Sequence, residues 1–481
     1  MVRLPAINGE QYISRINALQ SDVWLDGEKI TGNISEHPAF SGVMKSQANL
    51  YDLQYEKSIH DIMTFTSDTT GNKIGTSFMR PQSKEDLEKR RKMVQIWAKT
   101  NAGMMGRSPD YKNTTLMALA SAADLVHVDG ENFQTNLLKF FEYARDNDLS
   151  FTHTFITPQV NRSQMHFEAE ENIVAARIVD KTSEGLVIKG ARLLATQGGI
   201  TDEIIVSSSA LKMFDEPFAY VFSIPSNTKG LKFICRESFC YKRSKFDHPL
   251  GSRFEEMDSI VTFDNVIVPW DRVFVCENVE IANKLYAESS FKPLVLHQVV
   301  SRQVEKIAFL LGLAQSIVDT IAVGEYHHIR EKICEIIVAL ENHKALLLSS
   351  EQHAALDRWG TMAPDKHPLQ IAMMQFPKIY PRMTEILQLI GASGLVSIPS
   401  EKDFQSCLRG ELDQYLQAAT CDSYNRVKLF RLAWDVSMSA FGSRQTLYER
   451  FFFGDPARFI HTIYSEYDRK DIVKSIQDFL Q

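Results

Sequence analysis

Apolar and polar residues recur with two different periods along the chain. Up to about residue 150, and again from about residue 278 to the end, apolar side chains recur at the spacing of a helix. Between 151 and 277, short β-rich runs are separated by turn residues, which is typical of strands. The pattern predicts an α+β fold with a mostly helical N-terminal domain at 1–150, a β-barrel-like middle domain at 151–277 and a helix bundle at 278–481.

Single elements follow from the same pattern. Ser83 and Asp86 have the spacing of a capping box, so a helix is expected directly after them. Two strands are expected around the Ser-Glu-Gly turn at 183–185. Further strands are expected at 203–210, 219–225, 231–237 and 259–269, and helices at 114–126, 132–148, 299–321, 327–350, 377–393 and 425–441.

Composition and charge narrow the class of protein. The 481 residues are 44% hydrophobic and 23% charged, as in a globular protein, and the net charge is −7. A nucleic-acid partner is not expected, because it would need a concentrated basic face. The longest apolar stretch is interrupted by Gln315 and Asp319, so it predicts a buried helix and not a membrane span.

The six cysteines contain no C-x-x-C pair, which favours reduced structural thiols and a cytoplasmic location, and no metal site is expected from them. Neither a G-x-G-x-x-G after a strand nor a P-loop motif occurs, so Rossmann and P-loop nucleotide sites are unsupported. A β segment between two helical parts remains compatible with a flavin held at their junction.

The stretch GRSPDYKN at 106–113 has two interpretations. Ser108 can cap a helix, Pro109 suits its first position, and Asp110 complements the positive end of the helix dipole. Arg107 is left unexplained, because a cation before a helix N-terminus is mildly unfavourable. Arg107 and Tyr111 are therefore either ordinary surface residues or the edge of a ligand pocket.

Two further stretches carry candidate chemistry. In LSFTHTFITPQVNRS, at 149–163, His153 lies in a strand-like alternation, and Arg162 could meet a phosphate or form a surface ion pair. In FGSRQTLYERFFFGDP, at 441–456, Gly442 and Ser443 interrupt a helical pattern. A glycine inside a helix costs about 1 kcal/mol relative to Ala, so close approach of a ligand or of another helix is expected there.

Taken together, GRSPDY, THTFITPQVNRS, TQGGITDEIIV and FGSRQTLYERFFFGDP, in this order, resemble the oxygenase components of the 4-hydroxyphenylacetate 3-monooxygenase family. The resemblance implies an acyl-CoA-dehydrogenase-like fold and a homo-oligomer, with a tetramer expected. It also implies ortho-hydroxylation of a phenol by O2 through a flavin C4a-hydroperoxide. Reduced FAD would come from a separate NAD(P)H:flavin reductase.

The resemblance also assigns residues position by position. Arg107, Tyr111 and His153 match residues that contact the phenolic oxygen of the substrate, and Ser208 and Ser209 match positions near its carboxylate end. Positions that match the flavin site are His153, Phe155, Gln159, Arg162, Thr196, Gly442, Ser443, Arg444 and Gln445.

The proposed chemistry explains why these residue types are needed. An electrophilic oxygen reacts best with an electron-rich ring, so the phenol must gain phenolate character. A phenol of pKa about 10 lies about 3 units above neutrality, which corresponds to about 4 kcal/mol. Because a hydrogen bond to a charged partner contributes about 1.5–3 kcal/mol, two or three donors such as Arg107, Tyr111 and a protonated His153 would suffice.

Three alternatives remain beside this hypothesis, and a fourth, the dehydratase, fails on its cysteine count. One of the three is a non-catalytic binding protein that retains the scaffold. A chlorophenol monooxygenase would share fold, cofactor and phenol binding. An acyl-CoA dehydrogenase would retain FAD and use a carboxylate base, which the sequence does not identify among its many glutamates. The iron–sulfur flavoprotein 4-hydroxybutyryl-CoA dehydratase needs cysteine ligands in its N-terminal helical part, and this chain has none before Cys235.

Overall fold

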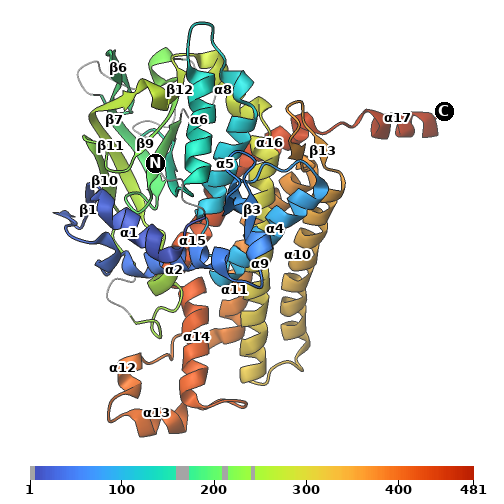
Figure 1. Ribbon diagram of the computed structural model, residues 1–481. Coiled ribbons are helices and arrows are strands. Elements are labelled where there is room, and N and C mark those ends of the chain that lie inside the picture. The colour runs from blue at the N-terminus through green and yellow to red at the C-terminus, as the bar shows by residue number, and fades with distance from the viewer. Residues whose placement is uncertain (1–5, 159–172, 208–214, 240–243) are drawn as a thin grey trace.

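The computed structural model describes residues 6–158, 173–207, 215–239 and 244–481. Figure 1 shows two sheets beside a bundle of long helices, with the N-terminal helices across the junction. No helix in these described ranges is long and apolar enough to cross a membrane.

The N-terminal helices cover the sheets and the upper part of the bundle. The predicted capping box is confirmed: the Ser83 side chain accepts a hydrogen bond from the Asp86 amide, and α4 starts at Lys84. The helices of this part are α1 (Gly9–Leu19), α2 (Ser41–Asp52), α3 (His60–Met63), α4 (Lys84–Thr100), α5 (Pro109–Ser121) and α6 (Phe133–Asp146). A small hairpin is formed by β3 (Thr64–Thr66) and β4 (Lys73–Gly75).

The β segment forms two sheets that pack face to face. A six-stranded sheet has the order β2-β1-β10-β11-β7-β6, and a four-stranded sheet has the order β12-β9-β8-β5. Phe222 and Phe263, from different sheets, meet edge to face with ring centroids 6.5 Å apart. The strands are β1 (Val23–Leu25), β2 (Glu28–Lys29), β5 (Phe151–Thr154), β6 (Arg177–Lys181), β7 (Gly185–Thr196), β8 (Glu203–Ser207), β9 (Tyr220–Pro225), β10 (Leu231–Cys235), β11 (Asp258–Pro269) and β12 (Val273–Cys276).

The C-terminal bundle is built around α9, which is buried along most of its length. Apolar side chains of α9 join those of the sheets and of α11 in one core. The helices are α7 (Gly251–Phe254), which lies between two strands, and then α8 (Val279–Glu288), α9 (Phe291–Thr320), α10 (His327–Gln352), α11 (Lys366–Gly391), α12 (Glu401–Phe404), α13 (Arg409–Tyr415), α14 (Ser423–Ser437), α15 (Ala440–Phe451), α16 (Pro456–Glu466) and α17 (Lys470–Phe479). A second hairpin is formed by β13 (Ala355–Leu356) and β14 (Met362–Ala363).

Three details differ from the sequence prediction. The segment expected as one helix at 425–441 is two helices. α14 ends at Ser437, and the Ser439 side chain then accepts a hydrogen bond from the Gly442 amide to start α15. α11 starts at Lys366 and carries Pro377 and Pro381 inside it, although proline normally starts or kinks a helix.

The third difference concerns the N-terminal segment. β1 and β2 extend the six-stranded sheet, with Val23 of β1 paired in parallel with Phe233 of β10. The helical period of the surrounding residues gave no sign of strands this short. The division at 1–150, 151–277 and 278–481 itself stays a prediction.

Candidate active site

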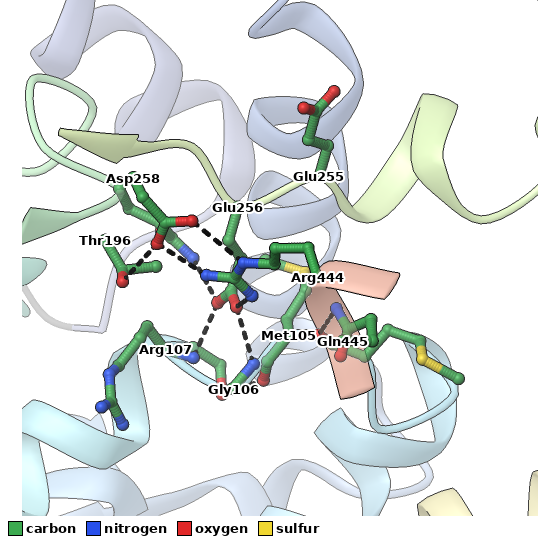
Figure 2. Close-up of polar contacts among 12 residues, drawn as sticks. Met105, Gly106, Arg107, Thr196, Glu255, Glu256, Asp258, Arg444 and Gln445 are labelled. Carbon is green, nitrogen blue, oxygen red and sulfur yellow. Dashed lines mark hydrogen bonds and ion pairs between the residues drawn. The ribbon is translucent and has the colours of Figure 1, made fainter. Parts of the chain in front are cut away.

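The loop before α5 is held through its backbone. The Gly106 and Arg107 amides donate to the two carboxylate oxygens of Glu256, at 3.0 and 2.6 Å. Gln197 donates to the same carboxylate at 2.9 Å. Figure 2 shows the Arg107 guanidinium turned away from this carboxylate. The loop is therefore fixed while the charged end of Arg107 remains available.

The Arg107 guanidinium lies against aromatic rings. Its central carbon is 4.2 Å from the centroid of the Tyr111 ring and 5.4 Å from that of Tyr448. Nε and Nη1 are buried and have no hydrogen-bond acceptor among the described residues. Burial opposes the charge, but Tyr448, Tyr111 and Glu256 raise the pKa of Arg107 above its ordinary value. Arg107 is thus a charged donor with unused capacity.

His153 lies on β5 beside the same aromatic residue. Its ring centroid is 5.9 Å from that of Tyr111 and 5.5 Å from that of Phe155, on which it stacks at 18°. Burial, followed by the charges of Lys112 and Arg107, lowers the pKa of His153 well below 6.5. The expectation of a protonated His153 is therefore wrong for this environment, which favours a neutral imidazole with a single N–H donor.

We call Arg107, Tyr111, Lys112 and His153 the basic cluster. Tyr111 and Lys112 lie on the first turn of α5, where both side chains are buried. The residues come from a loop, a helix start and a strand, and the Tyr111 ring contacts each of the other three. The structure thus brings together the three residues predicted to face the phenolic oxygen, and adds Lys112 to them.

The start of α5 is where the sequence predicts it, but its cap differs. Ser108 is the N-cap residue and Pro109 is the first helical residue. The Ser108 hydroxyl donates to Asp110 Oδ1 at 2.6 Å and does not cap a backbone amide. Gln298 on α9 donates to the other oxygen of Asp110 at 2.8 Å. Asp110 therefore fixes the helix start to α9.

Arg444 and Thr196 share one carboxylate. Arg444 donates through Nε and Nη2 to Asp258, at 3.0 and 2.7 Å, and Thr196 donates to Asp258 at 2.8 Å (Figure 2). Arg236 donates to Asp258 at 3.2 Å. Burial opposes ionisation, but Arg444 and Arg236 hold the pKa of Asp258 far below its usual range.

Gln445 connects the loop to a buried ion group. It donates to the Met104 carbonyl at 2.9 Å and accepts from Lys306 at 2.8 Å. Lys306 and Arg302 both donate to Glu449, with distances of 2.7 Å from Lys306 and 2.8 and 3.1 Å from Arg302. We call Glu256, Asp258 and Glu449, with the donors they bind, the carboxylate clamp.

Of the remaining predicted site residues, some lie among the residues that the structure describes and others do not. Gly442 is in the first turn of α15, where a Cβ would lie 2.5 Å from the Val436 carbonyl oxygen, so the close approach predicted there is to α14. Ser443 is exposed. Four predicted residues lie outside the described residues: Gln159, Arg162, Ser208 and Ser209.

Sequence reasoning missed several residues at this site. Tyr448 lies within a quoted motif, one helical turn after Arg444, and its buried hydroxyl has no hydrogen-bond partner in the described part of the chain. A Cβ on Gly106 would lie 2.1 Å from that hydroxyl oxygen, so glycine is needed there. In the sequence, Glu256 and Asp258 are marked only by an acidic stretch before a predicted strand.

The arrangement offers cationic and neutral hydrogen-bond donors. No group of three or more His, Cys, Asp or Glu side chains in the described ranges could hold a metal ion. Five cysteines, Cys235, Cys276, Cys334, Cys407 and Cys421, are free thiols. The basic cluster is suited to binding an anion or an oxygen that gains negative charge.

Family models match almost the whole chain. The model described as 4-hydroxyphenylacetate 3-hydroxylase N terminal matches residues 8–275, and the corresponding C-terminal model matches residues 282–481. A probable 4-hydroxyphenylacetate 3-monooxygenase of Bacillus subtilis (strain 168) is 55% identical over 98% of each chain. The oxygenase component of 4-hydroxyphenylacetate 3-monooxygenase from Geobacillus sp. (strain PA-9) is 46% identical over 100% of this chain and 97% of the relative.

Solved structures agree with the sequence comparisons. The crystal structure of an oxygenase component of 4-hydroxyphenylacetate 3-monooxygenase, complexed with FAD and 4-hydroxyphenylacetate, has a TM-score of 0.94 at 42% identity, covering 99% of this chain and 98% of that one. An archaeal 4-hydroxybutyryl-CoA dehydratase shares the fold, with a TM-score of 0.88 at 21% identity over 98% and 95% of the two chains. The predicted α+β fold class is confirmed.

Proposed function

Because the chain belongs to the 4-hydroxyphenylacetate 3-hydroxylase family, we propose that it is an oxygenase component that hydroxylates a phenol with O2 and reduced FAD. The hydroxyl group is added ortho to the existing one, so 4-hydroxyphenylacetate gives 3,4-dihydroxyphenylacetate. The observation that carries this proposal is the basic cluster, where the described residues provide no hydrogen-bond acceptor for Nε and Nη1 of the buried Arg107.

The basic cluster supports activation of the phenol. Arg107 supplies a full charge, Tyr111 a hydroxyl and His153 a neutral N–H donor. Because a charge-assisted hydrogen bond contributes about 1.5–3 kcal/mol and a neutral one about 1 kcal/mol, the three together match the roughly 4 kcal/mol that phenolate character requires. Phe155, stacked on His153, adds apolar surface that limits water at the reacting atoms.

Reduced FAD, when bound, would supply the electrons that activate O2, and the transferred oxygen atom comes from O2. One free donor fits such a ligand: the buried Nη1 of Arg444 has no hydrogen-bond partner among the described residues and lies 3.6 Å from Glu256. We propose that the flavin is held by His153, Phe155, Gln159, Arg162, Thr196, Gly442, Ser443, Arg444 and Gln445, and the carboxylate end of the substrate by Ser208 and Ser209.

Reduced FAD is made elsewhere. The relatives are named as oxygenase components, which implies a separate reductase. We propose a cytoplasmic NAD(P)H:flavin reductase that supplies reduced FAD by diffusion. The second candidate is another phenol hydroxylase of the same fold, since a 4-nitrophenol 2-monooxygenase oxygenase component of Rhodococcus sp. is 29% identical over 93% of this chain and 86% of the relative.

We also propose that the chain forms a homotetramer, with α17 as one of its contacts. α17 projects from the body of the molecule, and its large apolar residues are 52–87% exposed (Figure 1). They recur at the spacing of one helix face, which favours a second copy as the partner: Ile472, Val473, Ile476, Phe479 and Leu480. Ile476→Asp should reduce the assembly size in light scattering, while Gln477→Asp on the polar face should not. A tetramer in both variants would remove α17 from the interface.

The function is tested by product analysis under labelled O2. The full chain is incubated with FAD, NADH, an unrelated flavin reductase and a panel of phenols. Labelled 3,4-dihydroxyphenylacetate is the expected product. Hydrogen peroxide without a labelled product from 4-hydroxyphenylacetate would contradict the substrate, and no flavin-dependent use of O2 would favour the dehydrogenase alternative.

A further inference from the structure

Lys112 is a buried cation in the basic cluster with no role so far. It follows Tyr111 on the first turn of α5 and is 7% exposed. Its Nζ lies 5.2 Å from the centroid of the Tyr111 ring. A lysine is seldom buried to this extent without a partner, because the charged ammonium loses its hydration.

The described residues offer Lys112 neither a hydrogen bond nor an ion pair. The nearby carboxylates are occupied: Asp110 accepts from Ser108 and Gln298, and Glu256 accepts from the loop amides and Gln197. Lys112 thus differs from Lys306, which is also buried but is bound to Glu449. An amine in this position is suited to bind a ligand.

Both burial and the neighbouring charge act on Lys112. Burial first, and the charge of Arg107 second, lower the pKa of Lys112 well below 10.5. The amine therefore loses its proton more easily than a surface lysine does. The helix α5 packs against α6, α9 and β5. Among the described residues, the titratable groups that interact with Lys112 are Arg107 in the preceding loop, Tyr111 on α5 and His153 on β5.

We propose that Lys112 binds the substrate at its phenolic oxygen and accepts the proton that this hydroxyl loses. The O–H bond of the phenol breaks, an N–H bond forms on Nζ, and the resulting ammonium faces the phenolate. No electron is transferred in this step. The inference rests on the proposed function, because it names the base for the same phenol.

The phenolic oxygen is favoured over the substrate carboxylate for two reasons. Lys112 lies beside the same Tyr111 ring as Arg107 and His153, and these two residues are assigned to the phenolic oxygen. A carboxylate is already ionised at neutral pH and offers no proton to a neutral amine. Only the phenol makes use of an amine that can change its charge.

Two ligands separate these possibilities. 4-Nitrophenol has a phenol and no carboxylate, and its phenolate absorbs visible light whereas the neutral form does not. 4-Nitrophenylacetate has a carboxylate and no phenol. Each is titrated into the full-length protein without flavin turnover, and the pH at which half of the bound nitrophenol is ionised is measured.

Lys112→Met should raise that pH by about 1–2 units, since an opposite charge within hydrogen-bonding range shifts a pKa by about that much. Lys112→Arg keeps a charge but cannot accept a proton, so the midpoint should stay within about half a unit of the wild-type value, while binding of 4-nitrophenol should release to the medium the proton that the wild-type protein retains. The matched control is Lys139→Met, because Lys139 is an exposed lysine of α6. Lys112→Arg also keeps the test informative if the methionine variant does not fold.

An unshifted midpoint in Lys112→Met would overturn the inference. Weaker binding of 4-nitrophenylacetate with an unshifted nitrophenol midpoint would also overturn it, by moving Lys112 to the carboxylate. These failures differ from failure of the proposed function, in which the wild-type chain forms no labelled catechol from any phenol.

Discussion

Two regions meet at Gly106 and Arg107, and their polar groups are satisfied to different degrees. In the carboxylate clamp, Glu256, Asp258 and Glu449 each accept at least three hydrogen bonds. In the basic cluster, Arg107 keeps two buried nitrogens without acceptors, and Lys112 has no anionic partner in the described part of the chain.

The difference distinguishes buried charges that stabilise the fold from buried charges that bind a ligand. Buried carboxylates that are fully bonded within a protein hold its parts together, and the three carboxylates of the clamp connect the loop, β11, α9 and α15 in this way. Buried cations that remain without partners are costly, and such groups occur preferentially at ligand sites. Changes in the clamp should therefore affect stability, and changes in the basic cluster should affect activity.

The largest expected effect comes from Glu449→Gln. It leaves the buried Arg302 and Lys306 without a carboxylate, which costs about 3–5 kcal/mol of unfolding free energy. Chemical denaturation measures the loss. The control is Glu385→Gln, which removes an exposed pair with Arg382 and should cost less than about 1 kcal/mol. Equal losses in the two variants would contradict a structural role for Glu449.

Acid should weaken the same ion group. Burial opposes ionisation of Glu449, but Arg302 and Lys306 lower its pKa to about 2, from an ordinary value of 4.5. A lowered folded-state pKa stabilises the protein above pH 4.5, and this contribution of about 3 kcal/mol is lost as the pH falls toward 2. Glu449→Gln, measured by urea unfolding, should lose less stability over this range than the wild-type protein. An equal loss of stability in the variant and the wild-type protein would mean that groups other than Glu449 cause the acid sensitivity.

Arg107→Gln should show the opposite behaviour to Glu449→Gln. Loss of one charge-assisted hydrogen bond, about 1.5–3 kcal/mol, should lower kcat/KM for hydroxylation about 10- to 150-fold. Unfolding free energy should change by less than about 1 kcal/mol, and reduced FAD should still bind. Arg458→Gln, at an exposed arginine, should leave both quantities unchanged. A large stability loss with unaltered kcat/KM would place Arg107 with the clamp.

Arg444→Lys should have a smaller and mixed effect, because Arg444 belongs to the clamp and is also proposed to contact the flavin. Lysine cannot reproduce the two-point contact with Asp258, so about 1–2 kcal/mol of stability should be lost. Titration of reduced FAD without O2 should show weaker binding. An unaltered Kd would leave Arg444 with a structural role alone.

Sequence reasoning reached the site more easily through motifs than through periodicity. Arg107, Tyr111 and His153 are brought together as the resemblance implies, because each lies at a helix start or on a strand that the pattern itself predicts. Glu256 and Asp258 could not be singled out, since a carboxylate receives its role from donors far away in the sequence. The protonation of His153 was equally inaccessible, because it depends on burial and on Lys112.

The fold, like the site, could be predicted only in part. Long helices and strands follow the period of their apolar residues, whereas β1 has three residues and no period to recognise. The two prolines within α11 hid the part of that helix before residue 377 for a related reason: a local rule about proline was outweighed by the burial of the surrounding apolar face.

The pairing of β1 with β10 has a consequence for synthesis on the ribosome. Val23 of β1 pairs with Phe233 of β10, 210 positions later. β1 therefore stays unpaired until β10 has been synthesised. At about 5–20 residues per second, this delay lasts about 10–40 s. We expect the N-terminal segment to need chaperone protection during this interval, and a fragment that starts at residue 151 to expose the strand edge that β1 covers.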